Sequence, residues 1–355
     1  MLLVVNAGSS SIKLAVFDAG LAQVLAASVT EIGGAGRLVV AGVAQDCAAA
    51  DHRAALGLAL EGLGVAVADL TAAAHRVVHG GAALVRPARV TAAVIAGIEA
   101  CVPLAPLHNP ANLTAIRALQ DLASDLPQFV SFDTAFHATN PEVAVTYALP
   151  FAERDRGLRR YGFHGISYAG IVRKLQESSQ NPLPERLLAF HLGNGASLCA
   201  IRDGASVATT MGYSPLDGIT MGTRSGGVDG NAVLRLAELH GINGAGRILN
   251  RESGLLGLGG HSDMRALHAA GTPEAVFALE HFCYWAVRHA GSMIAAMGGV
   301  DAIAFTGGIG ENDAQVRAKI VEGLLWAGQV PVHIVPAEEE RTIAAEAMAL
   351  MAGGA

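Results

Sequence analysis

The chain has 355 residues, enough for two domains, and 52% of them are hydrophobic while 15% are charged. This composition excludes a disordered chain, and a net charge of −7 without a basic stripe argues against nucleic acid or an anionic membrane as a partner. The four cysteines form no C-x-x-C pair, which indicates a reducing cytoplasm. We expect no signal peptide, because the apolar start ends at Asn6, and no membrane span, because glycines and Asp301 interrupt the most apolar stretch.

Two strands, 2–5 and 12–17, are predicted on either side of a turn of small residues. The same layout returns further along the chain, where Asn6 falls on His191 and Asp18 on Asp203 at one constant offset. We also pair a second set of buried strands, 129–133 with 302–306. The repeat predicts two related α/β domains.

Helices are predicted between these strands. Asn109 is expected to cap a helix that has Pro110 at its first position and ends near Leu122. Thr272 is expected to cap a long helix whose apolar residues keep helical spacing and which ends before Gly298.

Two glycine- or serine-rich turns are candidate anion sites. The turn at 307–312 follows a strand and precedes a helix from about Asp313, an order typical of phosphate sites. Residues 6–13 read N-A-G-S-S-S-I-K, which fits either a plain hairpin or an oxyanion site, but no Walker A sequence occurs anywhere in the chain.

Charged side chains near predicted strand ends are candidate binding groups. His75 and His79 lie four apart on a predicted strand, roughly 13 Å from each other, so we reject a zinc pair. Arg76 beside them fits either a surface arginine or an anion-binding one. Asp133 follows a buried strand and is expected at the ligand-binding edge of an open sheet.

Two further residues lie among very small neighbours. His164 stands in the turn Y-G-F-H-G, where a lone histidine is more often structural than catalytic. Arg224 stands in M-G-T-R-S-G-G, and a decorative surface arginine rarely has such neighbours. We therefore interpret Arg224 as a phosphate-clamping arginine.

Taken together, these segments resemble the acetate kinases, within the acetate and sugar kinase/Hsp70/actin superfamily. The resemblance covers nearly the whole chain, and its most specific segments are 6–13, 75–81, 103–110, 132–137, 161–165, 191–195, 221–224 and 307–312. It implies an α/β fold of two related actin-like (ribonuclease H-like) domains with a cleft between them. The first, acid-binding domain would comprise 1–134 and 340–355, and the second, ATP-binding domain 135–339.

The resemblance also implies residue roles. Asn6 and Glu339 would ligate Mg²⁺ (or Mn²⁺), and Lys13 would bind the ATP phosphates. Arg76 would hold the acid's carboxylate, while Asp133, His164 and Arg224 would be catalytic. The pocket for the acid's methyl group would consist of Val78, Leu107, Phe163 and Pro215. The remaining ATP contacts would be His191, Leu192, Gly193, Asn194, Gly195, Asp263, Met264, Arg265, Gly308, Ile309, Gly310, Glu311 and Asn312.

The implied activity is ATP + acetate ⇌ ADP + acetyl phosphate, by direct in-line transfer in a cytoplasmic homodimer. Because acetate is already ionised at neutral pH, we interpret Asp133 as an orienting carboxylate rather than a general base. Two alternatives stay open: a propionate or butyrate kinase, and a non-catalytic nucleotide-binding protein of actin-like fold. The second has no need for Arg76, Asp133, His164 and Arg224, which are all present.

The chain departs from the family near its end. It is shorter, and the family's P-T-N-E-E appears here as P-A-E-E-E at 336–340, which leaves the metal ligand open among Glu338, Glu339 and Glu340. A terminal helix from Glu339 through Met351 is expected to return to the first domain.

Overall fold

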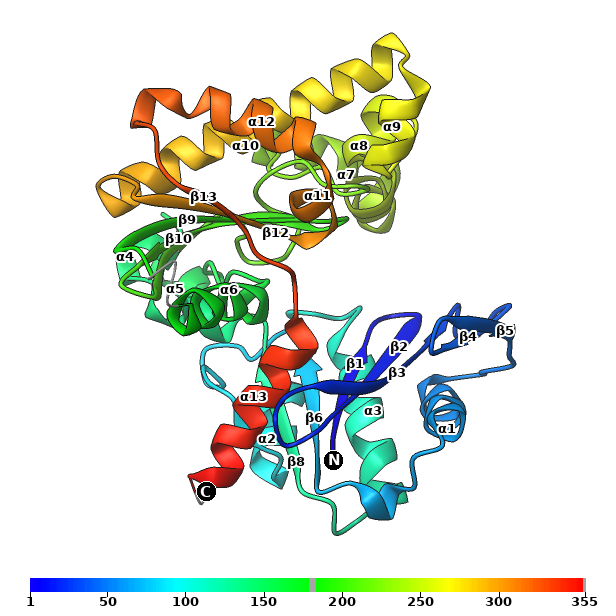
Figure 1. Ribbon diagram of the computed structural model, residues 1–355. Helices are drawn as coiled ribbons and strands as arrows, with labels where there is room; N and C mark the ends of the chain where they lie inside the picture. The colour runs from blue at the N-terminus through cyan, green and yellow to red at the C-terminus, as the bar shows by residue number, and fades with distance from the viewer. Residues whose placement is uncertain (179–182, 354–355) are drawn as a thin grey trace. The chain divides into compact units, whose positions relative to one another are not determined.

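The computed structural model describes residues 1–178 and 183–353. The chain forms two compact units: Met1–Phe136 with the chain from Glu338 onward, and His137–Ala337 (Figure 1). The first unit therefore contains both ends of the chain, as we expected, and the last two residues of the predicted domain range lie outside the described residues. In the described part of the chain no helix has both the length and the hydropathy to cross a bilayer.

The first unit is built on an eight-stranded sheet in the order β5-β4-β3-β2-β1-β6-β8-β7. Strands β1, β6 and β8 are parallel, whereas β1 through β5 form an antiparallel meander and β7 runs antiparallel to β8. The strands are β1 (Leu2–Ala7), β2 (Ser11–Phe17), β3 (Gln23–Thr30), β4 (Arg37–Val40), β5 (Val43–Asp46), β6 (Ala72–Val77), β7 (Ala88–Arg89) and β8 (Gln128–Phe132).

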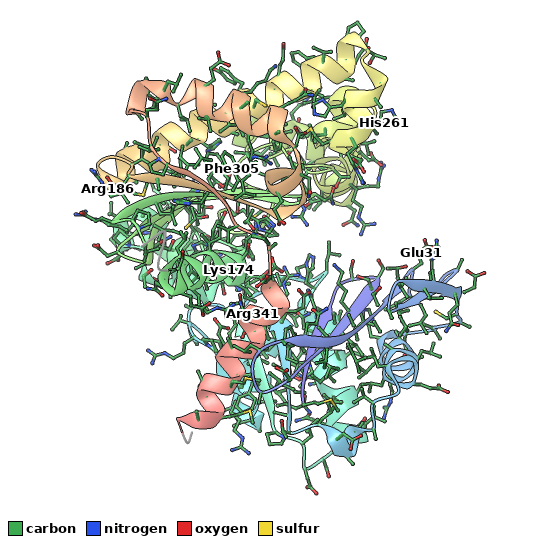
Figure 2. All side chains as sticks on the ribbon, viewed as in Figure 1. Glu31, Lys174, Arg186, His261, Phe305 and Arg341 are labelled. Carbon is green, nitrogen blue, oxygen red and sulfur yellow. The ribbon has the colours of Figure 1, made fainter. Side chains whose placement is uncertain are left out.

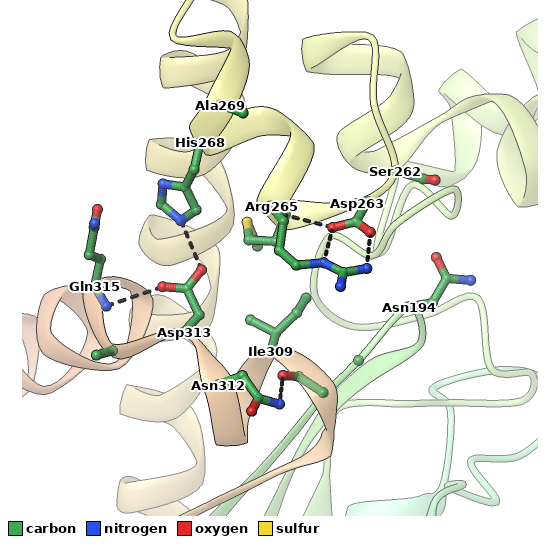
Figure 3. A pocket seen from close by; sticks show the side chains of 14 residues that line it. Asn194, Ser262, Asp263, Arg265, His268, Ala269, Ile309, Asn312, Asp313 and Gln315 are labelled. Carbon is green, nitrogen blue, oxygen red and sulfur yellow. Dashed lines mark hydrogen bonds and ion pairs between the residues drawn. The ribbon is translucent and has the colours of Figure 1, made fainter. Parts of the chain in front are cut away.

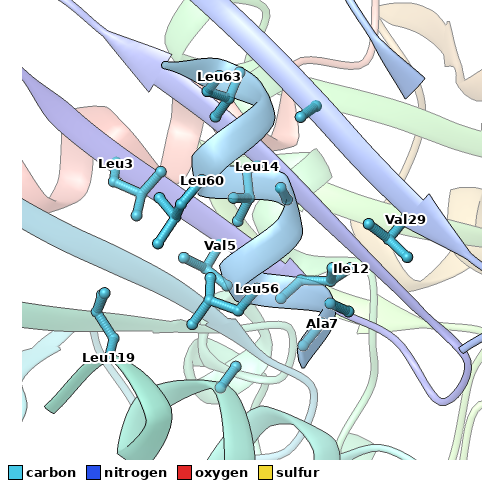
Figure 4. Packing of buried hydrophobic residues seen from close by; sticks show 14 of the residues in the cluster. Leu3, Val5, Ala7, Ile12, Leu14, Val29, Leu56, Leu60, Leu63 and Leu119 are labelled. Carbon is cyan, nitrogen blue, oxygen red and sulfur yellow. The ribbon is translucent and has the colours of Figure 1, made fainter. Parts of the chain in front are cut away.

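The side chains of β1 alternate between the two faces of this sheet and show what covers each face. Leu3, Val5 and Ala7 belong to a core shared with α1 (His52–Leu63) and α3 (Asn109–Leu122), as Figure 4 shows. The core includes Leu14, Leu56, Leu60 and Leu119. Because side chains of a strand alternate, Leu2, Val4 and Asn6 face the other side of the sheet.

Helix α13 (Glu339–Ala352) covers that other side. It contacts β1, β6 and β8, and its residues Ile343, Ala344 and Ala347 are buried (Figure 1). The predicted terminal helix on the first unit is thus present. Met351, to which we expected the helix to run, is 42% exposed and does not belong to the packed face.

Helix α3 ends at Leu122 as predicted, but the expected cap is wrong by one residue. His108 precedes the helix, and Asn109 is its first residue. The Asn109 side chain is buried and bonds the backbone of His79 in both directions, accepting from the N–H (3.2 Å) and donating to the carbonyl (3.0 Å). An asparagine bound to a neighbouring loop is not available to cap its own helix.

The unit also contains α2 (Ala92–Ala100) and the 3₁₀ turns η1 (Val67–Asp69) and η2 (Ala135–Thr139), the latter crossing into the second unit.

The second unit has a five-stranded sheet in the order β11-β10-β9-β12-β13. Its strands are β9 (Arg186–Leu192), β10 (Ala196–Arg202), β11 (Ala205–Thr209), β12 (Ala302–Thr306) and β13 (Val332–Ile334). Strands β9, β12 and β13 are parallel, and β10 and β11 continue antiparallel. This repeats the order β3-β2-β1-β6-β8 of the first unit, the arrangement expected of an actin-like pair of domains.

The repeat confirms the predicted correspondence of the two opening hairpins and corrects the second pairing. Strand β12 lies beside β9 as β6 lies beside β1, so 302–306 corresponds to β6 and not to 129–133. The counterpart of β8 is β13. The error arose because β8 and β12 are both five-residue strands, buried throughout, and burial does not tell one central strand from another.

Helices lie on both faces of this second sheet (Figure 1). The long helix α10 (Pro273–Met297) contacts β9, β10 and β11. As predicted, Thr272 caps it and it ends before Gly298. Helix α6 (Gly165–Glu177) contacts β9 and β12. In the sheet core Phe305, which is labelled in Figure 2, stacks on Phe190 with ring centroids 4.8 Å apart.

The predicted glycine turn at 307–312 is itself a short helix, α11 (Gly307–Asn312), and Asp313 caps α12 (Ala314–Gly323). The turn begins with Gly307 at φ 81°, where its missing side chain leaves room for the Leu192 backbone. The other described helices are α4 (Glu142–Val145), α5 (Phe151–Asp155), α7 (Gly230–Arg247), the π-helical η3 (Ile248–Glu252), α8 (Gly254–Gly259), α9 (Met264–Ala270) and η4 (Leu325–Ala327).

Candidate active site

The carboxyl ends of the three parallel strands of the first unit bring together Asn6, Arg76 and Asp133. Arg76 Nε and Nη2 donate to Asp133 Oδ1 and Oδ2 at 2.9 and 2.7 Å, a bidentate pair. Arg76 Nη1 donates to Asn6 Oδ1 at 3.3 Å. Lys13 pairs with Asn6 in the β1–β2 register and so shares its face of the sheet.

Arg76 and Asp133 are strongly desolvated, with side-chain exposures of 24% and 3%. Burial opposes the charge on Arg76, but Asp133 and then Glu339 outweigh it and hold the pKa of the guanidinium above its ordinary value. These bonds use three of the five guanidinium N–H groups, which leaves two for a ligand. The sequence interpretation of Arg76 as a surface arginine is therefore excluded.

The first turn of α13 places carboxylates beside this cluster. Asn6 Nδ2 donates to Glu340 Oε1 at 3.3 Å. Burial raises the pKa of Glu339. The positive charge of Arg76 opposes this rise, and the negative charges of Asp133 and Glu340 add to it. Glu338 is instead paired with Arg341 at 3.4 Å. Of the three glutamates left open by the sequence, Glu339 and Glu340 lie near Asn6 and Arg76.

Residues behind the cluster hold the strand ends in place. Asn112 donates to the Ala7 carbonyl (2.7 Å) and accepts from the Val78 N–H (3.2 Å), tying the ends of β1 and β6 together. His75 is buried against Gln128, and His79 Nδ1 accepts from the Gly81 N–H, so the two histidines serve different partners. Burial lowers the pKa of each to about 4, which keeps both neutral.

In the second unit, His164 and His191 lie face to face. Their ring centroids are 4.1 Å apart with 25° between the planes. His164 Nδ1 bonds Ser197 Oγ at 2.8 Å, and His191 Nδ1 bonds Ser167 Oγ at 2.8 Å. His164 immediately precedes α6 in a left-handed conformation, φ 59°, which is uncommon for a residue with a side chain.

Both imidazoles border the glycine loop 193–195. A methyl group built on Gly195 would lie 3.2 Å from His164 Nε2 and 3.7 Å from Arg224 Nη1, so these groups converge on the loop. Arg224 is half-buried and donates to the Pro215 carbonyl at 3.3 Å. Gly222 is packed so closely on the Asn194 side chain that any larger residue would collide with it. The small neighbours of Arg224 thus serve close packing around it.

A cavity of about 1040 Å³ opens beside this loop (Figure 3). The predicted residues that line it are Gly193, Asn194, Asp263, Met264, Arg265, Gly308, Ile309 and Asn312. Side-chain and backbone hydrogen bonds from Arg265 lower the pKa of Asp263 to about 2. Other predicted contacts lie outside the lining; for instance, the Leu192 side chain is fully buried, and Glu311 bonds the N–H groups of Gly307 and Ala337.

The sequence analysis missed part of this lining. The missed residues are Ser262, His268, Ala269, Asp313, Ala314 and Gln315. His268 Nε2 lies 2.8 Å from Asp313 Oδ2, whose other oxygen caps α12 (Figure 3). The available signal was helical spacing, because His268 lies about one turn after Arg265 on α9.

The predicted methyl pocket has two residues in each unit. Val78 is buried and Leu107 is 52% exposed in the first unit. Phe163 and Pro215 belong to the second, where the Phe163 carbonyl lies 2.9 Å from His137 Nε2.

A family model described as the acetokinase family matches residues 1–345. This chain belongs to the acetokinase family. The family's enzymes are phosphotransferases with a carboxyl group as acceptor. The acetate kinase of Methylocella silvestris is 41% identical over 390 residues, covering 98% of this chain and 96% of that protein. Because that alignment is longer than the chain itself, the relative has segments that this chain lacks, as we expected.

Solved structures agree with this assignment and with the two-domain actin-like fold. The acetate kinase of Porphyromonas gingivalis has a TM-score of 0.92 at 33% identity and covers 99% of both chains. A propionate kinase from Francisella tularensis has a TM-score of 0.92 at 31% identity and covers 97% of this chain and 98% of its own. The fold therefore accompanies more than one short-chain acid among these relatives.

Proposed function

We propose that the protein transfers the γ-phosphoryl group of ATP to acetate, giving ADP and acetyl phosphate. A carboxylate oxygen attacks phosphorus in line, and the electron pair of the broken P–O bond stays on the leaving ADP oxygen. The observation that carries the proposal is the desolvated Arg76 guanidinium, fixed in the plane of Asp133 with two N–H groups left to orient a carboxylate.

The second unit supplies the phosphate-binding groups in this proposal. The nucleotide lies in the cavity of about 1040 Å³, next to the loop 193–195 and helix α11. His164 and Arg224 border the same glycine loop and can donate hydrogen bonds to the charge that spreads over the γ-phosphoryl oxygens during transfer. The first unit supplies the acid-binding groups, and Lys13 is its predicted phosphate ligand.

Asp133 acts in this proposal by orienting Arg76. Both of its oxygens accept hydrogen bonds from the guanidinium, so it is not available as a base. Acetate needs no base, because it is already ionised at neutral pH. Positioning and charge neutralisation then account for catalysis, as in other phosphoryl transfers.

The donor atoms near Asn6 fit the Mg²⁺ that such a reaction needs. The Asn6 amide donates a hydrogen bond to Glu340, and the negative charges of Glu339, Asp133 and Glu340 repel one another. A divalent cation would relieve this repulsion. Asn6, Glu339 and Glu340 would hold the ion, which neutralises phosphate charge. Among the described residues no three His, Cys, Asp or Glu side chains form a metal cage. Phosphate oxygens and water would supply the remaining ligands.

Trapping of acyl phosphate with hydroxylamine, run with acids of two to five carbons, tests the proposal. We expect acetate to give the highest kcat/KM. One methylene group in an apolar pocket changes kcat/KM by about 10- to 200-fold, so a propionate kinase is readily recognised. ATP binding without acyl phosphate from any acid would contradict the proposal and leave a non-catalytic nucleotide binder. The cytoplasmic location and the homodimer stay predictions.

Arg76→Ala is expected to raise the acetate KM at least 100-fold at saturating Mg·ATP. The reason is that the substrate carboxylate loses its charged partner, a loss of about 3 kcal/mol or more. The variant also leaves Asp133 buried without its cation, so its thermal unfolding must be followed in parallel. Arg76→Met with Asp133→Asn removes both charges and controls for that cost. An unchanged acetate KM in either variant would place the carboxylate site elsewhere.

Glu339→Gln is expected to stabilise the metal-free protein at neutral pH. Folding raises the pKa of the Glu339 carboxyl above its ordinary value near 4.5. The stability that this carboxyl contributes is therefore fully present below pH 4.5 and is lost as the pH rises through the raised pKa. Thermal unfolding in EDTA at pH 7.5 should therefore give a higher Tm for the variant than for the parent, and the difference should vanish near pH 4.

The same variant is expected to lose its response to Mg·ADP. In the parent, a ligand at 100 times its Kd raises the unfolding free energy by about 2.7 kcal/mol. Glu338→Gln is the matched control, because that carboxylate pairs with Arg341 and should leave the response intact. A Glu339→Gln protein that responds as the parent does would remove Glu339 from the metal site.

A further inference from the structure

Two buried hydroxyl groups stand behind the imidazole of His164. Ser197 Oγ lies 2.8 Å from His164 Nδ1 and 2.6 Å from the Tyr168 hydroxyl. Ser197 and Tyr168 are both fully buried. The chain of hydrogen bonds thus runs from the Tyr168 phenol through the Ser197 hydroxyl to one nitrogen of the His164 ring.

This chain has a preferred direction. A phenol is a better donor than an aliphatic hydroxyl, so Tyr168 gives its proton to Ser197 Oγ, and the single Ser197 proton is then directed at His164 Nδ1. Burial raises the pKa of Tyr168 well above its ordinary value, so the phenol keeps that proton. With Nδ1 accepting, a neutral imidazole carries its hydrogen on Nε2, the atom that faces Gly195 and Arg224.

We propose that Ser197 and Tyr168 are positioning residues that hold His164 as the Nε2–H tautomer, so that its N–H points at the phosphoryl group beside the glycine loop. The proposal rests on the proposed function for the identity of that group. In this proposal two buried hydroxyls orient a catalytic donor, although neither hydroxyl touches the substrate.

The stacked partner ring is held in the same way. The two rings lie 4.1 Å apart, a distance at which two positive charges would repel each other. His191 repeats the arrangement, because Ser167 bonds its Nδ1 while its Nε2 lies toward Gly193, 3.8 Å from a methyl group built there. The two histidines thus offer parallel Nε2 positions to one loop.

A third serine–histidine pair in the same unit shows the contrast. His137 Nδ1 bonds Ser206 Oγ at 2.9 Å, but its Nε2 lies 2.9 Å from the Phe163 carbonyl. Both nitrogens of His137 therefore serve the fold, whereas the Nε2 of His164 faces the glycine loop. Ser206→Ala consequently removes the same kind of buried bond as Ser197→Ala without touching His164, and it is a matched control.

Nitrogen-15 NMR of histidine-labelled protein reads the tautomer directly. The ring signals that disappear in His164→Gln belong to His164. In the parent protein we expect a protonated Nε2 and an unprotonated Nδ1, and in Ser197→Ala a mixture of the two tautomers. A His164 that carries its proton on Nδ1 in the parent, or an unchanged tautomer in Ser197→Ala, overturns the proposal. Neither outcome depends on catalysis, so a failure of the proposed function remains distinguishable.

Kinetics supply the second readout. Ser197→Ala should lower kcat about 10- to 100-fold, which is the usual effect of removing the hydrogen-bond partner behind a functional histidine. The KM for Mg·ATP should stay within twofold of the parent. Tyr168→Phe should lower kcat less, because Ser197 remains. Ser197→Thr keeps the hydroxyl and should recover most of the loss. If Ser206→Ala lowers kcat as much as Ser197→Ala, the effect is general destabilisation and the proposal is wrong. If Ser197→Ala fails to fold, the tautomer of His164 in the parent and in Tyr168→Phe tests the proposal instead.

Discussion

Arg224→Lys is expected to lower kcat by about 100- to 1,000-fold while the KM for Mg·ATP changes little. Lysine keeps the positive charge but loses the planar fork that spans two phosphoryl oxygens, and loss of one such donor raises the barrier by about 2.7–4 kcal/mol. The Arg224 side chain is placed by its bond to the Pro215 carbonyl and by glycines that leave no room for other side chains. A lysine would reach the same region without that fixed orientation.

Steady-state kinetics at saturating acetate measure this change. A fall in kcat with constant KM identifies an interaction made only in the transition state. Arg235→Lys is the control, since Arg235 is an exposed arginine on α7 that pairs only weakly with Glu238, and its kcat should stay within twofold of the parent. An Arg224→Lys enzyme that also stays within a few-fold would exclude Arg224 as a transition-state donor.

Deletion of residues 340–355 is expected to unfold the first unit. The deletion removes Ile343, Ala344 and Ala347, which cover one face of the first sheet, and exposes Leu2 and Val4 beneath them. Truncating Ile343 alone to alanine should cost about 2–5 kcal/mol, a large share of the 5–15 kcal/mol that typically stabilises a domain. Losing the whole helix therefore exceeds what the unit can tolerate.

Urea unfolding followed by circular dichroism measures both changes. Deletion of 351–355 is the matched control, because it leaves all the buried residues of α13 in place. Ile343→Val, which removes one methyl group, should cost only about 0.5–1.5 kcal/mol. A chain lacking 340–355 that unfolds at the same urea concentration as the parent would contradict the packing described for α13.

The sequence predicted the elements that carry strong local signals. The opening hairpins, the cap at Thr272, the helix start near Asp313 and the terminal helix all follow from turn chemistry and periodicity. The cap assigned to Asn109 was wrong because the competing partner, the His79 backbone, is about thirty residues away in the chain. Likewise, the pairing of 129–133 with 302–306 was wrong because strand order in a sheet is a long-range property.

The site shows the same division. Residues at the ends of strands, such as Arg76 and Asp133, were singled out because a parallel sheet places its strand ends at one edge. His268 and Gln315 were missed because they line the cavity from helices α9 and α12, whereas the sequence analysis looked for binding groups in glycine turns and at strand ends. The buried hydroxyl of Ser197 was missed because serine in a strand carries no signal until its partners are seen.

The division of the first unit between the two ends of the chain affects how the protein is made. The second unit is one continuous segment, so a ribosome can release all of it for folding while the first unit still lacks α13. At about 5–20 residues per second, the roughly two hundred residues from His137 to Ala337 keep the nascent β1–β6–β8 face uncovered for about 10–40 s. The domain whose synthesis starts first is thus the last to be completed, and its small, apolar sheet face is the surface that a chaperone would have to shield during that interval.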